Sequence, residues 1–188
     1  MRLETERLIL RPWEDRDRAP FAEIVGDPEV RRFYPRTLTP AEASAEIDNA
    51  WAQARAVGFH FQAAELKSDG ALVGLVGIGR IPELTKTAIP GRPEVEIGWL
   101  FARRFWGRGL APEGARAWLD YAWQTLDLPA IVAFTAAVNL PSQRVMHKIG
   151  MTHDLSGDFD HPRIAEGQPL RPHVLYRIAN PAAPRRSG

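Results

Sequence analysis

Cysteine is absent from this sequence of 188 residues, and its absence excludes disulfide bonds and thiol catalysis. Histidine is scarce, and the five histidines lack the spacing of a metal site, so no metal is expected. Charge of one sign is not in excess either: a net charge of +1 gives no argument for binding nucleic acid or an anionic membrane. No apolar run reaches the roughly 20 residues that span a bilayer. We therefore expect a cytoplasmic protein.

The length and composition are those of one folded domain. A chain of 188 residues with 45% hydrophobic and 25% charged residues can bury a sizeable core. We expect a single domain over residues 1–179. Residues 180–188 are rich in proline and arginine, so we expect a disordered C-terminal tail there.

The stretch Glu94–Leu126 organises the rest of the chain. Val95–Phe101 is rich in β-branched and aromatic residues, which predicts a strand. A basic turn containing two glycines follows at Ala102–Leu110, and apolar residues then recur at helical spacing. Pro112 suits the first turn of that helix, where a missing N–H costs nothing. The unit is therefore a strand, a glycine turn and a helix.

This turn has the chemistry of an anion site. The first backbone N–H groups of a helix have no partner within it and lie at the positive end of the helix dipole. Gly107 and Gly109 lack a Cβ, so phosphates can approach the main chain, and three arginines add charge (Arg103, Arg104 and Arg108). The plain alternative is an ordinary strand-to-helix turn with solvated arginines. A nucleoside-triphosphate P-loop is excluded, because no Gly-Lys-Ser/Thr motif is present.

The turn Trp-Gly-Arg-Gly-Leu-Ala-Pro-Glu resembles the acetyl-CoA diphosphate motif of the GNAT N-acetyltransferases, (Gln/Arg)-x-x-Gly-x-(Gly/Ala). Two frames match it, one from Arg104 to Gly109 and one from Trp106 to Ala111. The second frame, with Trp in the first place, is similar to the branch that acts on the N-termini of ribosomal proteins. Three further segments fit that branch in family order: Thr5–Trp13, Glu96–Trp99 and Asn139–Met151. The resemblance spans about residues 3–178.

The remaining elements are predicted from hydrophobic periodicity and turn signals. Further strands are predicted at Thr5–Trp13, Phe59–Leu66, Ala71–Ile81, Ala130–Thr135 and His173–Ile178. Further helices are predicted at Asp15–Val25, with Asp15 as N-cap, and at Ala41–Ala56 and Pro141–Ile149. Pro82–Pro93 is predicted to be a loop, and Thr152–Pro172 a strand followed by a long loop. This order of elements favours a mixed α/β sheet.

The family resemblance implies an α/β fold in one domain, with helices flanking a mixed central sheet. In the family, two parallel strands splay apart and form the acyl-CoA cleft that the thioester enters. Those strands would be Val95–Phe101 and Ala130–Thr135. Acetyl-CoA, as co-substrate, would contact Trp99, Leu100, Phe101, Arg104, Trp106, Gly107, Arg108, Gly109, Leu110, Ala111, Asn139 and Ser142.

Acetyl transfer needs a held donor, a stabilised oxyanion and a proton for the departing thiolate. The resemblance places Asn139 near the pantetheine or diphosphate arm, and asparagine is also a good helix N-cap, so both roles are compatible. A backbone N–H near Trp99 or Leu100 would stabilise the oxyanion. Many family members protonate the thiolate with a tyrosine, but Met146 holds the matching position. The branch resemblance implies Ser142 instead, which would otherwise satisfy a backbone group in the first helical turn.

The attacking amine also needs a base. Glu96 lies on the organising strand and within a family motif, and a carboxylate near a low-dielectric cleft can take the amine proton through water. An equal alternative is a structural carboxylate that is hydrogen-bonded to a neighbouring strand.

Acceptor contacts are expected on the side opposite the CoA arm. Phe33 and Tyr34 lie in an irregular stretch and would line an acceptor cleft or plug an edge of the core. Asp158 and Asp160 belong to an acidic loop that would attract an ammonium group or form a solvated cap.

The leading hypothesis is an enzyme that moves an acetyl group from acetyl-CoA to a primary amine by direct attack on the thioester. The acceptor would be a protein N-terminus or a small cationic amine. One alternative is a transferase for another acyl donor. Another is a non-catalytic acyl-CoA-binding or regulatory module, which the missing tyrosine at Met146 favours slightly. No nucleic-acid, membrane or metal partner is expected, and the protein would be a monomer or a homodimer.

Overall fold

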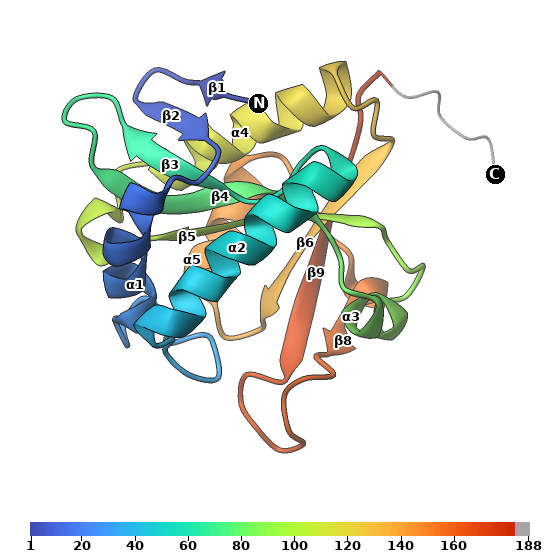
Figure 1. The fold of residues 1–188 in the computed structure, drawn as a ribbon. Helices are drawn as coiled ribbons and strands as arrows, with labels where there is room; N and C mark the ends of the chain where they lie inside the picture. Colours follow the sequence, from blue (N-terminus) through green and yellow to red (C-terminus); the bar gives the residue numbers. More distant parts are fainter. Residues whose placement is uncertain (183–188) are drawn as a thin grey trace.

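The computed structural model describes residues 1–182. Its strands are β1 (Leu3–Glu4), β2 (Leu8–Arg11), β3 (Gln62–Leu66), β4 (Leu72–Arg80), β5 (Val95–Phe101), β6 (Ala130–Ala136), β7 (Thr152–His153), β8 (Phe159–Asp160) and β9 (Pro172–Ala179). Its α-helices are α1 (Arg18–Gly26), α2 (Pro40–Val57), α3 (Glu83–Ala88), α4 (Leu110–Gln124) and α5 (Leu140–Lys148). Short 3-10 helices occupy Asp15–Asp17, Arg103–Phe105 and Leu155–Gly157. Figure 1 shows these elements.

The strands form one mixed sheet of nine strands in the order β1-β2-β3-β4-β5-β6-β9-β7, with β8 paired to β9. Every pair is antiparallel except β5 and β6, which run parallel. β4 and β5 pair along their whole length, from Gly74–Phe101 to Arg80–Val95. β5 and β6, in contrast, pair only at Glu96 and Val132. The two parallel strands therefore diverge beyond that pair, which confirms the predicted α/β fold with a splayed central pair.

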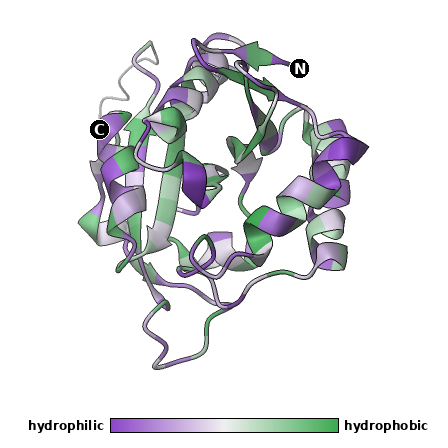
Figure 2. Ribbon diagram, turned by 90° about the vertical axis from the view of Figure 1, so that its left-hand side faces the viewer, coloured by the Kyte–Doolittle hydropathy of each residue, from purple (hydrophilic) through white to green (hydrophobic). Residues whose placement is uncertain are grey.

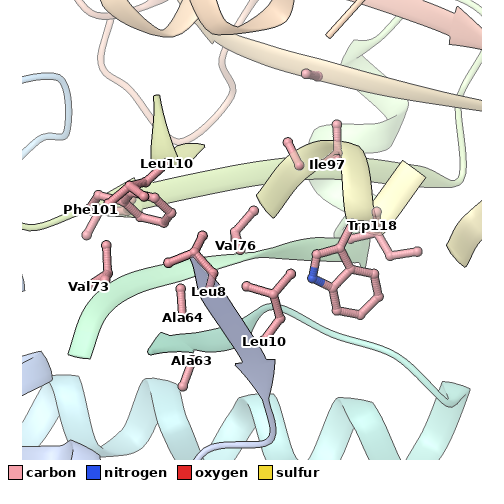
Figure 3. Packing of buried hydrophobic residues seen from close by; sticks show 14 of the residues in the cluster. Leu8, Leu10, Ala63, Ala64, Val73, Val76, Ile97, Phe101, Leu110 and Trp118 are labelled. Atoms are coloured by element: carbon pink, nitrogen blue, oxygen red, sulfur yellow. The ribbon is translucent and has the colours of Figure 1, made fainter. Parts of the chain in front are cut away.

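Helices cover both faces of the sheet. Leu75 of β4 lines a small cavity together with Ile47 and Ala50 of α2. The next residue, Val76, points to the opposite face and is buried with Trp118 of α4 (Figure 3). Hydrophobic residues colour much of the sheet, whereas the helices alternate between hydrophobic and hydrophilic residues (Figure 2). The sheet is thus the middle layer of three.

The first predicted strand is interrupted. Thr5 and Leu8 close a tight turn, in which the Leu8 N–H donates to Thr5 Oγ1 and the Thr5 N–H to the Leu8 carbonyl. The turn splits Thr5–Trp13 and leaves two short strands, β1 and β2. Asp15 is not an N-cap either: it lies in a 3-10 helix whose N-cap is Glu14, and the N-cap of α1 is Asp17.

Two predicted loops contain regular structure. Residues 82–93 include α3, which is anchored by the buried Thr85 and Ile89 and by an ion pair between Lys86 and Glu94. The segment after Thr152 continues through a 3-10 helix into β8, which pairs with β9. In both cases contacts with distant parts of the chain stabilise structure that the local sequence does not show.

The domain extends past the predicted boundary at residue 179. Asn180 is buried, its N–H donates to the Pro129 carbonyl, and its side chain donates to the Leu128 carbonyl. Residues 183–188 of the expected disordered tail lie outside the described residues. Across residues 1–182, no helix combines the length and the hydrophobicity needed to cross a membrane.

Candidate active site

The turn between β5 and α4 presents a row of free backbone N–H groups. Gly107 and Gly109 adopt φ angles of 74° and 76°, in the left-handed region that favours glycine, and Gly109 is the N-cap residue of α4. Within residues 1–182, none of the backbone N–H groups from Gly107 to Ala111 donates to another backbone group. Consecutive free N–H groups at the start of a helix form a concave anion site. The turn therefore has the free N–H groups and the left-handed glycines that the predicted anion site would need.

The arginines of this turn are available for an anion. In the part of the chain that the structure describes, Arg103, Arg104 and Arg108 form no ion pair with an acidic side chain. The guanidinium groups of Arg104 and Arg108 lie 4.7 and 5.7 Å from the centroid of the Phe105 ring. An open pocket of about 500 Å³ adjoins Arg103 and Arg104, but it is also lined by two acidic side chains, Glu23 of α1 and Asp27 just after that helix. The glycine turn is therefore the better site for a diphosphate.

Three side chains expected at the CoA site lie inward instead. Leu100, Phe101 and Leu110 are buried in the core, so only their backbone can meet a ligand. Trp106 is partly exposed, and its indole N–H donates to the Phe101 carbonyl at 2.7 Å. Trp106 therefore fixes the end of β5 against the turn.

Backbone geometry distinguishes the two candidate oxyanion donors. The Ala102 N–H donates to the Val73 carbonyl of β4 at 2.8 Å. In an antiparallel pair, alternate residues direct both backbone groups at the partner strand. Leu100 therefore faces β4, whereas the Trp99 N–H faces the side from which β6 has separated. Of the two candidates, Trp99 is therefore the one positioned to offer its N–H to a ligand between β5 and β6.

Asn139 and Ser142 join the start of α5 to both diverging strands. Asn139 is the N-cap residue of α5: its Oδ1 accepts from the Ser142 N–H at 3.3 Å. Its Nδ2 donates to Thr135 Oγ1 of β6 at 2.8 Å. Ser142 Oγ accepts a hydrogen bond of 3.1 Å from the Trp99 indole. Met146, at the position of the family tyrosine, is buried in the core and has no proton to donate.

Glu96 lies where β5 and β6 part. It forms the only register pair between these strands, with Val132. Its side chain is partly buried, and desolvation raises its pKa to about 8. Across residues 1–182, no hydrogen bond ties this carboxyl to a neighbouring strand, so the structural role has no bond to support it. Glu94, in contrast, pairs with Lys86, whose hydrogen bond lowers the pKa of Glu94.

A strip without side chains lies beside Glu96. Its register partner on β4 is Gly79, and a Cβ added there would lie 3.1 Å from the Phe61 ring and 3.4 Å from His60 Nδ1. A Cβ at Gly98 would lie 3.2 Å from the same ring. The side chains of His60 and Phe61 therefore pack directly on the glycine strip, next to the carboxyl of Glu96. Burial also lowers the pKa of His60, which keeps that imidazole neutral near pH 7.

The segment between α1 and α2 approaches both the carboxyl and the turn. The ring of Tyr34 is exposed and lies within reach of the charges of both Arg31 and Glu96. The Arg31 guanidinium lies 3.9 Å from the centroid of the Tyr34 ring. Arg32 lies between the rings of Phe33 and Trp106, 4.9 and 4.8 Å from their centroids.

The two acidic residues of the late loop have partners within the fold. Asp158 Oδ1 accepts from the Leu175 N–H and contacts His153 Nε2, both at 2.9 Å. Asp160 pairs with Arg171 at 3.0 Å. Both carboxylates therefore contribute to the packing of β8 against β9, and no contact joins them to Glu96 within the described residues. The same part of the chain contains no group of three potential metal ligands.

Two residues that support the glycine turn between β5 and α4 were not predicted from the sequence. Glu113, in the first turn of α4, forms an ion pair with Arg7 of the β1–β2 turn. Both residues stand in segments that carry the family resemblance, Thr5–Trp13 and the glycine turn. Their presence in these segments was the available signal, but the sequence does not show that the two segments touch.

Comparisons with known proteins agree with this geometry. The acetyltransferase (GNAT) domain family matches residues 7–152. The uncharacterised protein YkkB of Bacillus subtilis (strain 168) is 34% identical over 151 residues, which cover 80% of this chain and 84% of that protein. The FsC-acetyl coenzyme A-N(2)-transacetylase of Aspergillus fumigatus is 30% identical, over 80% of this chain and 65% of that enzyme.

A solved structure supports the same assignment. The GNAT-family acetyltransferase from Bacillus anthracis superposes with a TM-score of 0.77 at 26% identity, over 96% of this chain and 99% of that one. The resemblance that the glycine turn carries is thereby confirmed. The chain belongs to the GNAT family of acetyltransferases, the enzymes that transfer an acetyl group from acetyl-CoA to an amine.

Proposed function

We propose that the protein acetylates a primary amine, carried by a protein N-terminus or a small cationic molecule, by direct attack of the amine on the thioester of acetyl-CoA. The observation that carries this proposal is the position of Glu96. Its carboxyl, with a pKa of about 8, lies at the point where the parallel strands part. The cysteine-free composition suits a cytoplasmic enzyme.

The glycine turn fits the diphosphate of acetyl-CoA. The free N–H groups from Gly107 to Ala111 supply donors, and the unpaired arginines of the turn supply positive charge. The pantetheine arm would then run from the turn along the exposed edge of β5, past Phe101 and Trp99. Asn139 and Ser142 at the start of α5 would form the other wall of this channel.

Three groups would carry the reaction. The amine reacts in its neutral form: as its nitrogen attacks the thioester carbonyl carbon, Glu96 takes a proton from that nitrogen through water and later releases it to solvent. The Trp99 N–H stabilises the oxyanion, a contribution that is often worth about 3–4 kcal/mol. When the carbon–sulfur bond breaks, Ser142 donates its hydroxyl proton to the thiolate and recovers a proton from solvent.

The acceptor would enter from the side of Tyr34, Phe61 and His60. His60 and Phe61 border the glycine strip on the face that Glu96 occupies, and Tyr34 lies within reach of the Glu96 charge. The relative in Aspergillus is named for transfer to an N(2) atom, which supports nitrogen as the acceptor. Asp158 and Asp160 are weaker candidates for acceptor contacts, because both carboxylates already have partners.

Release of free thiol tests the proposal. Acetyl-CoA and longer acyl-CoAs would each be incubated with a panel of N-terminal peptides, polyamines, alcohols and anionic amines. We expect amine-dependent thiol release with acetyl-CoA and a cationic or N-terminal acceptor. A preference for a longer acyl chain would identify another acyl donor. Binding of acetyl-CoA without turnover across the panel would identify a regulatory acyl-CoA-binding module.

A further inference from the structure

The first turn of α4 is fastened to the N-terminal turn by a carboxylate. Glu113 Oε1 accepts from Thr5 Oγ1 at 2.5 Å and from the Arg7 N–H at 2.8 Å. Glu113 Oε2 accepts from Arg7 Nε at 2.7 Å and lies 2.5 Å from a terminal guanidinium nitrogen. The side chain of Glu113 is only 16% exposed. We call this set of contacts among Thr5, Arg7 and Glu113 the brace.

Arg7 extends the brace into the glycine turn itself. Its Nη1 donates to the Arg108 carbonyl at 2.8 Å, and Arg108 lies between the two left-handed glycines. A trans peptide directs its C=O and the following N–H to opposite sides. Because Arg7 holds the Arg108 carbonyl, the Gly109 N–H is turned away from the N-terminal loop. On that side it has no backbone acceptor within the described residues, like the other N–H groups from Gly107 to Ala111.

The brace also compensates the negative charge of Glu113 next to the glycine turn. A carboxylate in the first turn of α4 would by itself repel a diphosphate bound at the same helix end. Burial alone would raise the pKa of Glu113, but the hydrogen bonds from Thr5 and Arg7 outweigh burial and lower it. Glu113 therefore stays ionised, and the guanidinium of Arg7, whose Nε and Nη2 both contact Glu113 Oε2, compensates its charge within the protein.

We propose that Arg7 is a positioning residue for acyl-CoA: it aims the Gly109 N–H at the diphosphate and cancels the charge of Glu113. This inference rests on the proposed binding of the diphosphate at the glycine turn. Arg7 itself does not touch the reacting atoms. Its effect should therefore depend on whether the acyl donor carries a diphosphate.

The experiment compares two acyl donors in Arg7→Gln and Arg7→Lys variants. Acetyl-CoA carries the diphosphate, whereas S-acetylpantetheine lacks it. We expect the KM for acetyl-CoA to rise about tenfold in both variants, the effect of one or two lost hydrogen bonds. Lysine keeps the charge but cannot reach Glu113 and the Arg108 carbonyl together. The KM for S-acetylpantetheine and the kcat with either donor should change less than twofold.

Controls separate this inference from the proposed function. Arg2→Gln removes an exposed arginine of the same segment, paired with Glu4, and should change neither KM. Gly109→Glu should abolish binding of CoA in calorimetry. If Gly109→Glu has no effect, the proposed site of the diphosphate is wrong. If it abolishes binding but the Arg7 variants bind CoA normally, only the role of Arg7 is overturned.

Equal losses with both donors would show a merely structural role for Arg7 and would also overturn the inference. Thr5→Val and Thr5→Ser provide a second route should the Arg7 variants fail to fold. Valine removes the hydroxyl that donates to Glu113, and serine restores it. A KM for acetyl-CoA that rises with valine, recovers with serine and leaves S-acetylpantetheine unaffected supports the brace. A valine variant without this selective rise contradicts it.

Discussion

The indole N–H of Trp99 donates a hydrogen bond of 3.1 Å to the hydroxyl oxygen of Ser142. Indole can only donate, so Ser142 accepts through a lone pair and its own proton stays available for another acceptor. The bond also joins β5 to the start of α5, across the line where β5 and β6 diverge. The Ser142 hydroxyl, with its proton available where β5 and β6 diverge, is suited to protonate a departing thiolate.

Replacing Ser142 should therefore affect turnover more than donor binding. We expect Ser142→Ala to lower kcat by about 10²–10⁴-fold, the usual contribution of a general acid. The affinity for acetyl-CoA in calorimetry should change little. Ser142→Thr keeps a hydroxyl and should retain more activity than the alanine variant. A fall in kcat below about threefold, in single-turnover experiments that exclude product release, would return Ser142 to a capping role.

Glu96 should give the enzyme a distinct pH dependence. Its carboxyl, with a pKa of about 8, is protonated at lower pH and cannot then accept a proton. With an acceptor whose amine stays neutral over the whole range, kcat/KM should rise with pH and level off above about pH 8. Glu96→Gln should abolish this ascending limb and lower kcat. An unchanged limb in the glutamine variant would assign the titration to another group.

The same carboxyl makes a prediction about stability. Between the ordinary pKa of 4.5 and about 8, the unfolded chain has released the proton of Glu96 while the folded protein keeps it. The folded state then binds more protons, so the free energy of unfolding falls as pH rises through this window. Urea unfolding at several pH values should show a smaller fall for Glu96→Gln. Parallel curves for the two proteins would contradict the raised pKa.

The glycine turn can be tested by blocking it. Gly109→Glu adds bulk and negative charge at a residue with a φ of 76°, where a side chain also strains the backbone. We expect acetyl-CoA binding to be lost in calorimetry while circular dichroism shows a folded protein. Gly70→Glu is the matched control, because Gly70 has a φ of 71° in the distant turn between β3 and β4. Unchanged affinity in a folded Gly109→Glu variant would place the diphosphate elsewhere.

The acidic loop is tested by changing Asp158 and Asp160 together to asparagine. Because the folded protein uses both carboxylates for contacts around β9, we expect a stability loss of about 1–3 kcal/mol in urea unfolding. The KM for the best amine should stay the same at low and high salt. A KM that rises at low salt only would show that the loop attracts the acceptor after all.

The fold was predictable where local pattern and tertiary structure agree. The unit from β5 to α4 carries a strand composition, two glycines and a helical apolar stripe, and its predicted bounds match closely. α3 was missed because six residues between prolines have no helical pattern of their own. Its stability comes from the burial of Thr85 and Ile89 and from the Lys86–Glu94 pair, which only the folded chain brings together.

The features of the candidate site that depend on local sequence were also predictable, whereas those that depend on distant contacts were not. The anion-binding turn was visible because glycine and helix-start signals are local, and Glu96 was visible through its motif. Whether a carboxylate is free or paired depends on partners elsewhere in the chain. Asp160 and Arg171 meet through the β-pairing of their own loop, and Glu96 forms no ion pair within residues 1–182. The sequence alone does not distinguish these acidic residues. The choice of Trp99 over Leu100 likewise needed the register of β4.

The brace determines when, during synthesis of the chain, the glycine turn can first bind its ligand. Thr5 and Glu113 are 108 residues apart, so the turn that would hold a diphosphate lacks its support until that length of chain has been made. At about 5–20 residues per second, this interval is roughly 5–20 s. Leu8 and Leu10 of β2 wait nearly as long for α4 to cover them. A nascent chain on the ribosome could therefore bind acyl-CoA only after the turn with Thr5 and the first turn of α4 have come into contact. Bound acyl-CoA would stabilise the chains in which this contact has formed.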